Sequence, residues 1–344
     1  MGTKLGDIMN ADVITLRELS GRAIAIDAFN TIYAFLASIR QPDGTPLKDD
    51  KGRITSHLSG LFYRNLNLLE HGINPVYVFD GEAPTLKAAE VERRMEFREA
   101  ARKEWIRAKE EGRIEDARRA AQASSRLTTP MVEDSKKLLT ALGIPVVQAL
   151  SEGEALAAQM TRSNIVWASA SQDNDSLLYN CPRMIRNLSI SGRRRVSRSK
   201  TYKTIHPEII DLDLNLKLMG ITREQLIDIA ILVGTDYNKK LEGVGAKTAL
   251  KWIKKHGSLE NVEAERGITL DFPYPEIREI FLDPPKVELQ EPKWSDPQDE
   301  DLKRILCSEH DFSPNRVEKS LERLHTALEE VKGSTQQSSL TDFF

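Results

Sequence analysis

Seven acidic side chains of this sequence follow short apolar segments or lie in compact acidic motifs. Asp27 comes directly after the segment 22–26, and Asp80 comes directly after the segment 75–79. The other five lie in the motifs SEGE, SQDND and GTD and are Glu152, Glu154, Asp173, Asp175 and Asp236. Carboxylate oxygens are the ligands that Mg²⁺ and Mn²⁺ prefer, and crowded carboxylates repel one another without a cation. The pattern therefore predicts a divalent-cation site.

Each of these acids taken alone also has a structural interpretation. An aspartate directly after a strand is often the N-cap of a helix. Ser151 with Glu154 fits a capping box, although that motif leaves Glu152 unexplained. The cation site is favoured because several acids at strand ends of one sheet would converge on one edge.

Other common site chemistries find no support in the sequence. The only cysteines are Cys181 and Cys307, and there is no HExxH, no CxxC and no pair of histidines at ligand spacing. These absences exclude a disulfide framework and an ordinary zinc site. The low cysteine content also suggests a reducing compartment.

The acids are carried by alternating strand-like and helix-like segments. Apolar runs at 22–26, 75–79, 144–148 and 165–169 predict strands, and the spacing over 55–69 predicts a helix. This order predicts an α/β fold with a twisted, mostly parallel central sheet and helices on both faces. Ligand sites of such sheets lie at the carboxyl ends of the strands, which is where Asp27 and Asp80 fall.

Basic residues are concentrated in three other stretches. The stretch 87–137 is rich in Ala, Arg, Lys and Glu, so it predicts helices that bury little. Lys87, Arg94, Arg98 and Arg102 share roughly one face of the first helix, although such a stripe is usually just a solvated surface. The stretch 183–203 holds eight basic residues and no acid, and Ser191-Gly192 predicts the turn of a basic hairpin there.

The third basic stretch begins at the motif GVGAKT, which only superficially resembles a P-loop because Ala246 separates Gly245 from Lys247. A glycine turn that opens a lysine-rich helix can instead hold a DNA phosphate through backbone N–H groups. The net charge of −3 alone does not indicate a nucleic-acid partner, but two bound divalent cations would change it to +1. Segregated basic charge then fits a protein that binds the phosphate backbone.

No membrane association is expected. The sequence has no run of about 18 apolar residues, which a membrane-spanning helix needs. The first residues lack a signal-peptide core, and Gly6 breaks the myristoylation pattern. We therefore expect a soluble, cytoplasmic protein.

The motifs, in their order, resemble those of the flap endonucleases, the structure-specific 5′ nucleases of DNA replication and repair. The resemblance rests on Met1-Gly2 and on the motifs IDA, VFDG, SEGEA, ASQD, GTDY and GVG, which begin at residues 26, 78, 151, 170, 234 and 243. It covers nearly the whole chain. Because the chain stops at its C-terminal motif without a long basic tail, it looks like the archaeal type. Asn174 is a departure, since the family usually has Tyr there.

The resemblance implies roles for individual residues. The seven acids would line a site for two Mg²⁺ ions, with Mn²⁺ able to substitute, and Lys87 and Arg94 would be catalytic bases of a helical arch. The DNA-binding residues would be Gly2, Tyr33, Arg40, Thr55, Gly243, Gly245, Lys247, Phe312, Ser313 and Arg316. Within this set, Tyr33 would stack on DNA, and Thr55 with the last three would hold a one-nucleotide 3′ flap. Ordinary core packing is the alternative for Phe312.

The implied organisation is one nuclease domain over 1–332 followed by a tail over 333–344. The domain would comprise an N-terminal region at 1–98, a helical arch at 82–135, an internal region at 116–258 and a helix-hairpin-helix-like element at 219–257. The stretch 283–301 is rich in Pro and acids and predicts an irregular surface connection. The segment GSTQQSS at 333–339 predicts flexibility.

The tail carries a pattern that matches the motif for binding the replication sliding clamp (PCNA). Gln337 is followed by an aliphatic residue three positions later and by two aromatic residues at six and seven positions. One helical turn can bring Leu340 and Phe343 to the same side, with Phe344 adjacent, as an apolar plug. The alternative is a disordered tail with chance hydrophobic residues.

The implied activity is hydrolysis of phosphodiester bonds near the base of 5′ flaps, with 5′–3′ exonuclease activity, in Okazaki fragment maturation and DNA repair. The partners would be branched DNA and the clamp, and the protein would be a monomer near the nucleoid. A 5′ exonuclease or junction-resolving relative is the alternative within the class. A haloacid-dehalogenase-like phosphatase is disfavoured because Asp27 is followed by Ala28-Phe29 rather than by x-Asp. The full set of acids argues against a non-enzymatic clamp-binding scaffold.

Overall fold

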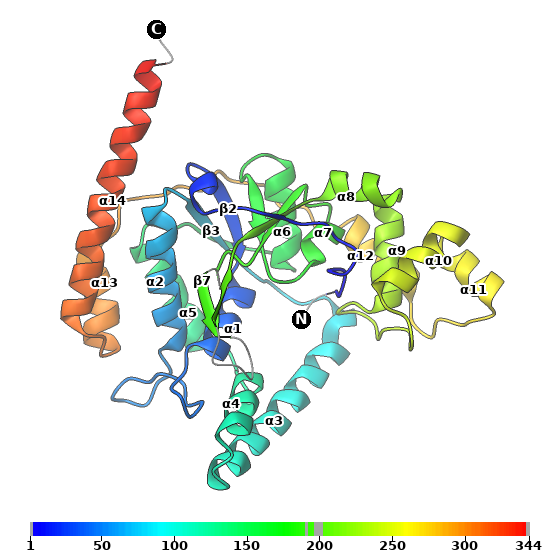
Figure 1. The fold of residues 1–344 in the computed structure, drawn as a ribbon, viewed down its shortest axis with the longest axis horizontal. Coiled ribbons are helices and arrows are strands. Elements are labelled where there is room, and N and C mark those ends of the chain that lie inside the picture. Colours follow the sequence, from blue (N-terminus) through cyan, green and yellow to red (C-terminus); the bar gives the residue numbers. More distant parts are fainter. Residues whose placement is uncertain (1–2, 190–191, 196–201, 342–344) are drawn as a thin grey trace.

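The computed structural model describes residues 3–189, 192–195 and 202–341, and a seven-stranded sheet lies at its centre (Figure 1). The strand order is β1-β9-β6-β5-β2-β3-β4. The pairs β2–β3, β2–β5, β3–β4 and β5–β6 are parallel, whereas β9 is antiparallel to both β1 and β6. The strands are β1 Asp12–Val13, β2 Ala23–Asp27, β3 Asn74–Phe79, β4 Val146–Gln148, β5 Ala168–Ala170, β6 Arg183–Arg186 and β9 Glu208–Asp211. The prediction of a mostly parallel sheet is confirmed.

The register of the parallel strands brings their acidic ends to one edge. Ile26 on β2 lies opposite Tyr77 on β3 and opposite Ala170 on β5. Asp27, Asp80 and the segment that follows β5 therefore leave the sheet side by side. All four predicted strands exist, but the last two begin at Val146 and Ala168, later than the apolar runs that predicted them.

Helices cover both faces of the sheet, as predicted. Ile24 and Ile26 point into a core shared with α1 (Ala28–Ser38), α2 (Ser56–Glu70) and α5 (Thr129–Ala141). Ala25 points to the other face, where it meets α6 (Gly153–Arg162). β2 is apolar on both sides because it is buried on both sides.

The stretch 87–137 contains two helices that bury little, as its composition predicts, but the prediction is wrong for residues 129–137, which belong to α5 and pack against the first core. A short 3₁₀ turn, η2 (Thr85–Lys87), leads into α3 (Ala88–Glu110), which packs against α4 (Ile114–Ala123). Ala108 is the one buried residue of α3. The pair projects from the body of the molecule (Figure 1), so its orientation depends on polar contacts more than on a core.

A second group of helices packs around α9 (Arg223–Val233), whose residues from Leu226 to Val233 are all buried. Its neighbours are α7 (Asp175–Leu178), α10 (Ala246–His256) and α12 (Tyr274–Leu282), while α11 (Leu259–Arg266) packs against α10. The helix α8 (Leu212–Met219) precedes α9. The glycine turn at 243–245 joins α9 to α10, so the predicted lysine-rich helix follows it.

The C-terminal part returns to the first core. Residues 283–298 form no regular element, as predicted, but they are anchored by Trp294, whose Nε1 donates to the Pro75 carbonyl at 2.8 Å. They lead to α13 (Asp299–Lys303), to a π-helical turn, η3 (Arg304–Glu309), and to the long α14 (Pro314–Thr341). The backbone of α14 stays helical through 333–341, where the sequence predicted flexibility. Extending an existing helix is easier than starting one.

The basic stretch forms the predicted hairpin, but with a different turn. β7 (Gly192–Arg195) pairs antiparallel with β8 (Tyr202–Ile205), and Arg195 lies opposite Tyr202. The connection is therefore 196–201, which lies outside the described residues together with Ser191. Gly192 begins a strand, so the predicted turn at Ser191-Gly192 is wrong. No helix in the described ranges is both long and apolar enough for a membrane span.

Candidate active site

Asp27 is both a helix cap and a member of the acidic group. It is the N-cap of α1, and its Oδ1 accepts the backbone N–H of Asn30 at 2.9 Å. Its Oδ2 accepts from the Ser171 hydroxyl at 3.4 Å. Burial, and then the charges of Asp80 and Asp173, raise the pKa of Asp27 to about 8. The cap thus explains only one of its two oxygens.

Asp80 follows β3 and is held by the start of α6. The backbone N–H of Gly153 donates to Asp80 Oδ1 at 2.7 Å. A Cβ at position 153 would lie 2.7 Å from that same oxygen, so only glycine allows this approach. Burial, and then the charge of Glu152, raise the pKa of Asp80 to about 6.

The two glutamates of the SEGE motif take different roles at the start of α6. Glu152 occupies the N-cap position without a side-chain cap bond. Glu154 Oε1 instead accepts from the hydroxyl of Ser171 at 3.1 Å. Burial raises the pKa of Glu154 well above its usual range, and Asp175 and Asp27 add to the shift. The capping-box interpretation of Ser151 and Glu154 is therefore wrong.

The remaining three acids approach the same edge from two directions. Asp173 and Asp175 follow β5, and Asp175 Oδ1 accepts the backbone N–H of Thr3 at 2.8 Å. Asn174 Nδ2 donates to the Thr3 carbonyl at 3.0 Å, so the departure from the family pattern helps to anchor the N-terminal segment. Burial raises the pKa of Asp175 to about 6, with further contributions from Asp236 and Asp173. Asp236 arrives from the turn after α9.

Two cationic side chains from the base of α3 lie among these acids. Lys87 Nζ is 2.6 Å from Glu152 Oε2 and 3.1 Å from Asp236 Oδ2. The guanidinium of Arg94 pairs with Asp236 and with Glu90, the latter at 2.8 Å. Burial lowers the pKa of Lys87, but the charges of Glu152 and Asp236 outweigh it and raise this pKa above its usual value.

The seven acids form one electrostatic group whose charge the chain does not balance. Asp27 is repelled by Asp80 and Asp173. Asp80 is repelled by Glu152 and Asp236, and Glu154 is repelled by Asp175. Two cations face seven carboxylates, and no three acids in the described part of the chain are arranged to hold one ion as they stand. The donors are all oxygen, and burial and repulsion raise the pKa values of Asp27, Asp80, Glu154 and Asp175, so the group fits hard divalent cations.

Tyr33 and Arg40, the predicted DNA contacts on and beside α1, already have partners within the protein. The guanidinium of Arg98 lies 4.7 Å from the centre of the Tyr33 ring, which connects α3 to α1. Arg40 donates to the carbonyls of Leu36 and Gly44 and to the hydroxyl of Ser125, each at 2.8 Å. Arg40 therefore has a structural role. Gly2, which precedes the anchored Thr3, lies outside the described residues.

The predicted 3′-flap residues come from two segments that are joined by hydrogen bonds. Thr55 is buried just before α2, while Ser313 and Arg316 are exposed at the start of α14. Phe312 packs against the first core, as the core-packing alternative proposed. The Asp50 N–H donates to Asp311 Oδ2 at 2.8 Å, which brings the two segments together.

The remaining predicted contacts lie in the turn before α10 and in the C-terminal tail. Gly243 and Gly245 are exposed, and Gly245 is the N-cap of α10 with Lys247 exposed in the first turn. Gly243 has φ +73°, a conformation that favours glycine. In the tail, Gln337 and Leu340 fall on the helical backbone of α14, and Phe343 and Phe344 lie outside the described residues.

Two residues near the acids were not found from the sequence. Glu90 binds both Arg93 and Arg94, and the spacing of Glu90 and Arg94 by four residues is a signal that could have found it. Asn30 Nδ2 donates to Asp173 Oδ2 at 2.9 Å. The two are 143 positions apart, so no local pattern predicts this contact.

Comparison with known proteins agrees with this geometry. Residues 5–101 match the XPG N-terminal domain, and residues 143–236 match the XPG I-region. The chain is 51% identical over 339 residues to flap endonuclease 1 of Pyrococcus furiosus, which covers 98% of this chain and 99% of that protein. The chain belongs to the flap endonuclease family. The flap endonuclease 1 of Saccharolobus solfataricus is 49% identical over 336 residues, or 96% of each chain.

The fold supports the same membership in the flap endonucleases. The structure of flap endonuclease-1 from Methanococcus jannaschii superposes with a TM-score of 0.70 at 36% identity, covering 96% of this chain and 99% of that one. Flap endonucleases are metal-dependent nucleases that hydrolyse DNA, and the oxygen-rich acidic group accords with that chemistry.

Proposed function

We propose that this protein is a Mg²⁺-dependent, structure-specific 5′ flap endonuclease with 5′–3′ exonuclease activity, acting in Okazaki fragment maturation and DNA repair. The observation that carries the proposal is the convergence of seven carboxylates at one edge of the sheet, directly below the cationic base of the α3–α4 arch. The names of the relatives at about 50% identity support the choice of a 5′ flap as the substrate.

Two Mg²⁺ ions are the proposed cofactor, and Mn²⁺ would substitute for them. The ligands would come from Asp27, Asp80, Glu152, Glu154, Asp173, Asp175 and Asp236. When bound, such ions supply an activated water and stabilise the charge on the leaving oxygen. The protein contributes an edge on which buried carboxylates are already gathered and cannot escape to solvent.

Lys87 and Arg94 are proposed to contact the scissile phosphate. In the DNA-free protein each pairs with Asp236, and Lys87 also pairs with Glu152. The carboxylates in these ion pairs are also proposed ligands of the divalent ions. A DNA phosphate that binds together with the metal ions would be a new anionic partner for Lys87 and Arg94. The two side chains would then stay at the site and neutralise charge on the phosphate.

The remaining DNA contacts are proposed at three other places on the protein. The turn at Gly243 and Gly245, with Lys247, would hold duplex phosphates without regard to sequence, so binding should weaken as salt is raised. Tyr33 would stack on a base near the junction. Thr55, Phe312, Ser313 and Arg316 would form the pocket for a one-nucleotide 3′ flap.

The C-terminal residues are proposed to bind the sliding clamp through Gln337, Leu340, Phe343 and Phe344. Deleting 337–344 should leave the cleavage of a small flap substrate unchanged but remove stimulation by the cognate clamp. Equal clamp affinity of the truncated and full-length proteins, measured by calorimetry, would refute this part of the proposal without affecting the nuclease assignment.

The decisive experiment is cleavage of a 5′-labelled double-flap DNA in the presence of Mg²⁺. We expect one main product from a cut near the flap base, no product in excess chelator, and slower cutting of nicked and four-way substrates. A preference for the four-way junction would favour the junction-resolving alternative, and degradation only from free 5′ ends would favour a simple exonuclease. Arg316→Ala should abolish the preference for a substrate with a 3′ flap, with Lys319→Ala as the control on the same helix.

A further inference from the structure

Asn30 makes three contacts at the acidic edge that no part of the proposed mechanism uses. It lies in the first turn of α1, where its backbone N–H donates to Asp27 Oδ1 at 2.9 Å. Its side-chain Nδ2 donates to Asp173 Oδ2 at 2.9 Å, and its Oδ1 accepts the backbone N–H of Gln172 at 3.4 Å. One residue therefore joins the carboxylates that follow the neighbouring strands β2 and β5.

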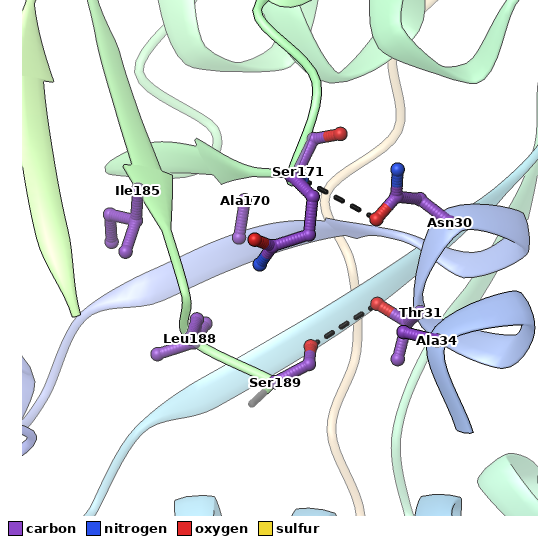
Figure 2. A pocket seen from close by; sticks show the side chains of 9 residues that line it. Asn30, Thr31, Ala34, Ala170, Ser171, Ile185, Leu188 and Ser189 are labelled. Carbon is purple, nitrogen blue, oxygen red and sulfur yellow. Dashed lines mark hydrogen bonds between the residues drawn. The ribbon is translucent and has the colours of Figure 1, made fainter. Parts of the chain in front are cut away.

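The side-chain amide of Asn30 is fixed from both sides. Its oxygen faces the loop after β5, and its nitrogen faces Asp173, so a flipped amide would lose both hydrogen bonds. Figure 2 shows Asn30 beside a small cavity whose lining includes Ser171, Thr31 and Ser189. Thr31 lies in the same helix turn as Asn30, and its Oγ1 is 3.2 Å from Oγ of Ser189, which follows β6, across that cavity. Neither partner of this contact is an acid.

We propose that Asn30 is a positioning residue for Asp173, an inference that rests on the proposed function of that carboxylate as a metal ligand. A hydrogen bond to Oδ2 restricts the orientation of the Asp173 carboxylate, and that orientation sets how the group would meet a divalent cation. Groups that bind a ligand from behind in this way set its orientation, and losing them commonly weakens metal binding by about 10–100-fold. A neutral amide does this without adding another charge to a group that already repels itself.

The experiment measures Mn²⁺ binding to the full-length protein without DNA, by titration calorimetry. Asn30→Leu keeps the volume and the backbone N–H but removes the donor, and we expect affinity to fall about 10-fold. Asn30→Ala should have a smaller effect, because the cavity of about 10 Å³ would enlarge and admit a water as a substitute donor. Thr31→Val, which removes the Thr31–Ser189 bond in the same cavity, should leave Mn²⁺ affinity unchanged.

A second measurement separates positioning from a general structural role. Cleavage by Asn30→Leu should be slow at limiting Mn²⁺ and recover when Mn²⁺ is raised, whereas a damaged fold would stay slow at every concentration. In an Asp173→Ala background, Asn30→Leu should cause no further loss of affinity. Unchanged Mn²⁺ affinity in both Asn30 variants would overturn the inference. If Asp173→Ala itself leaves Mn²⁺ binding intact, the ligand assignment in the proposed function fails instead.

Discussion

The acidic edge of the sheet and the loop before α2 each contain an aspartate that is at least partly buried, Asp27 and Asp49, and the pKa values of the two are shifted in opposite directions. Burial at Asp49 is outweighed by hydrogen bonds, so its pKa is lowered. It accepts the backbone N–H groups of Lys51 and Arg53 and the Arg53 guanidinium at 2.7 Å. At Asp27, burial and the neighbouring acids raise the pKa to about 8.

This difference in pKa shift distinguishes carboxylates that stabilise the fold from those that do not. Asp49 receives donors and a cation from its own segment, so its ionised form stabilises the fold. Asp27, Asp80 and Glu154 at the sheet edge are repelled by other acids, so their ionised forms oppose folding, and the proposed divalent cations would remove this repulsion. Acids with raised pKa values that repel one another, such as Asp27 and Asp80, are therefore the ones that we propose as cation ligands.

The largest expected effect comes from removing an acid of the cluster. Asp173→Ala or Asp80→Ala should reduce cleavage by at least about 10³-fold, since the site loses a cation ligand, while DNA affinity stays the same or increases. Because repulsion is relieved, the metal-free variant should be at least as stable as the wild type. Single-turnover cleavage, fluorescence anisotropy with labelled DNA and thermal unfolding measure the three quantities. Near-normal cleavage by either variant would remove the acid from the active site.

A somewhat smaller effect is expected for the cations that lie among the acids. Lys87→Ala and Arg94→Ala should each slow single-turnover cleavage by about 10²-fold and change DNA affinity much less, because their charge is needed mainly in the transition state. Arg107→Ala is the matched control, since Arg107 lies on the same helix with its side chain 67% exposed. Equal rates for all three variants would show that α3 contributes only a solvated surface.

The opposite kind of aspartate should show the opposite phenotype. Asp49→Ala should lower the free energy of unfolding by about 2 kcal/mol, because it leaves buried donors of the loop without a partner. Cleavage by the folded fraction should stay close to wild type. Urea denaturation provides the measurement, and the exposed neighbour Asp50 provides the control as Asp50→Ala. If Asp49→Ala instead abolishes cleavage and leaves stability unchanged, the comparison between the two regions is wrong.

The smallest effect is a pH dependence of metal stabilisation. The folded chain binds protons at Asp27, Asp80 and Asp175 more tightly than the unfolded chain does, so metal-free stability should fall as pH rises from about 4 to about 8. Mg²⁺ removes this penalty, so the increase in Tm on adding Mg²⁺ should be at least about 2 °C larger at pH 8 than at pH 5. Asp27→Asn should reduce the difference, and a pH-independent increase would contradict the raised pKa values.

Much of the site could be predicted because its parts are local. Asp27, Asp80 and the acids of the SEGE and SQDND motifs lie at the end of a strand or at a helix start, and Asp236 lies in the turn after α9. Periodicity finds such elements from short windows. The features that the sequence did not predict depend on contacts between separate segments of the chain. The turn of the basic hairpin was misplaced because glycine is typical of turns. Pairing with β8 instead places Gly192 in a strand, opposite Ile205.

The sequence by itself determined which groups are available for the proposed chemistry: acidic side chains, basic side chains and strands that end where several of the acids begin. The tertiary structure alone decided how these groups meet. It brought Asn30 to Asp173, Thr3 to Asp175, and Lys87 to both Glu152 and Asp236. It also surrounded Asp49 with hydrogen-bond donors and placed Asp27 among other acids, although both residues are aspartates. A pKa depends on burial and on neighbours from distant segments, and only the folded chain supplies both.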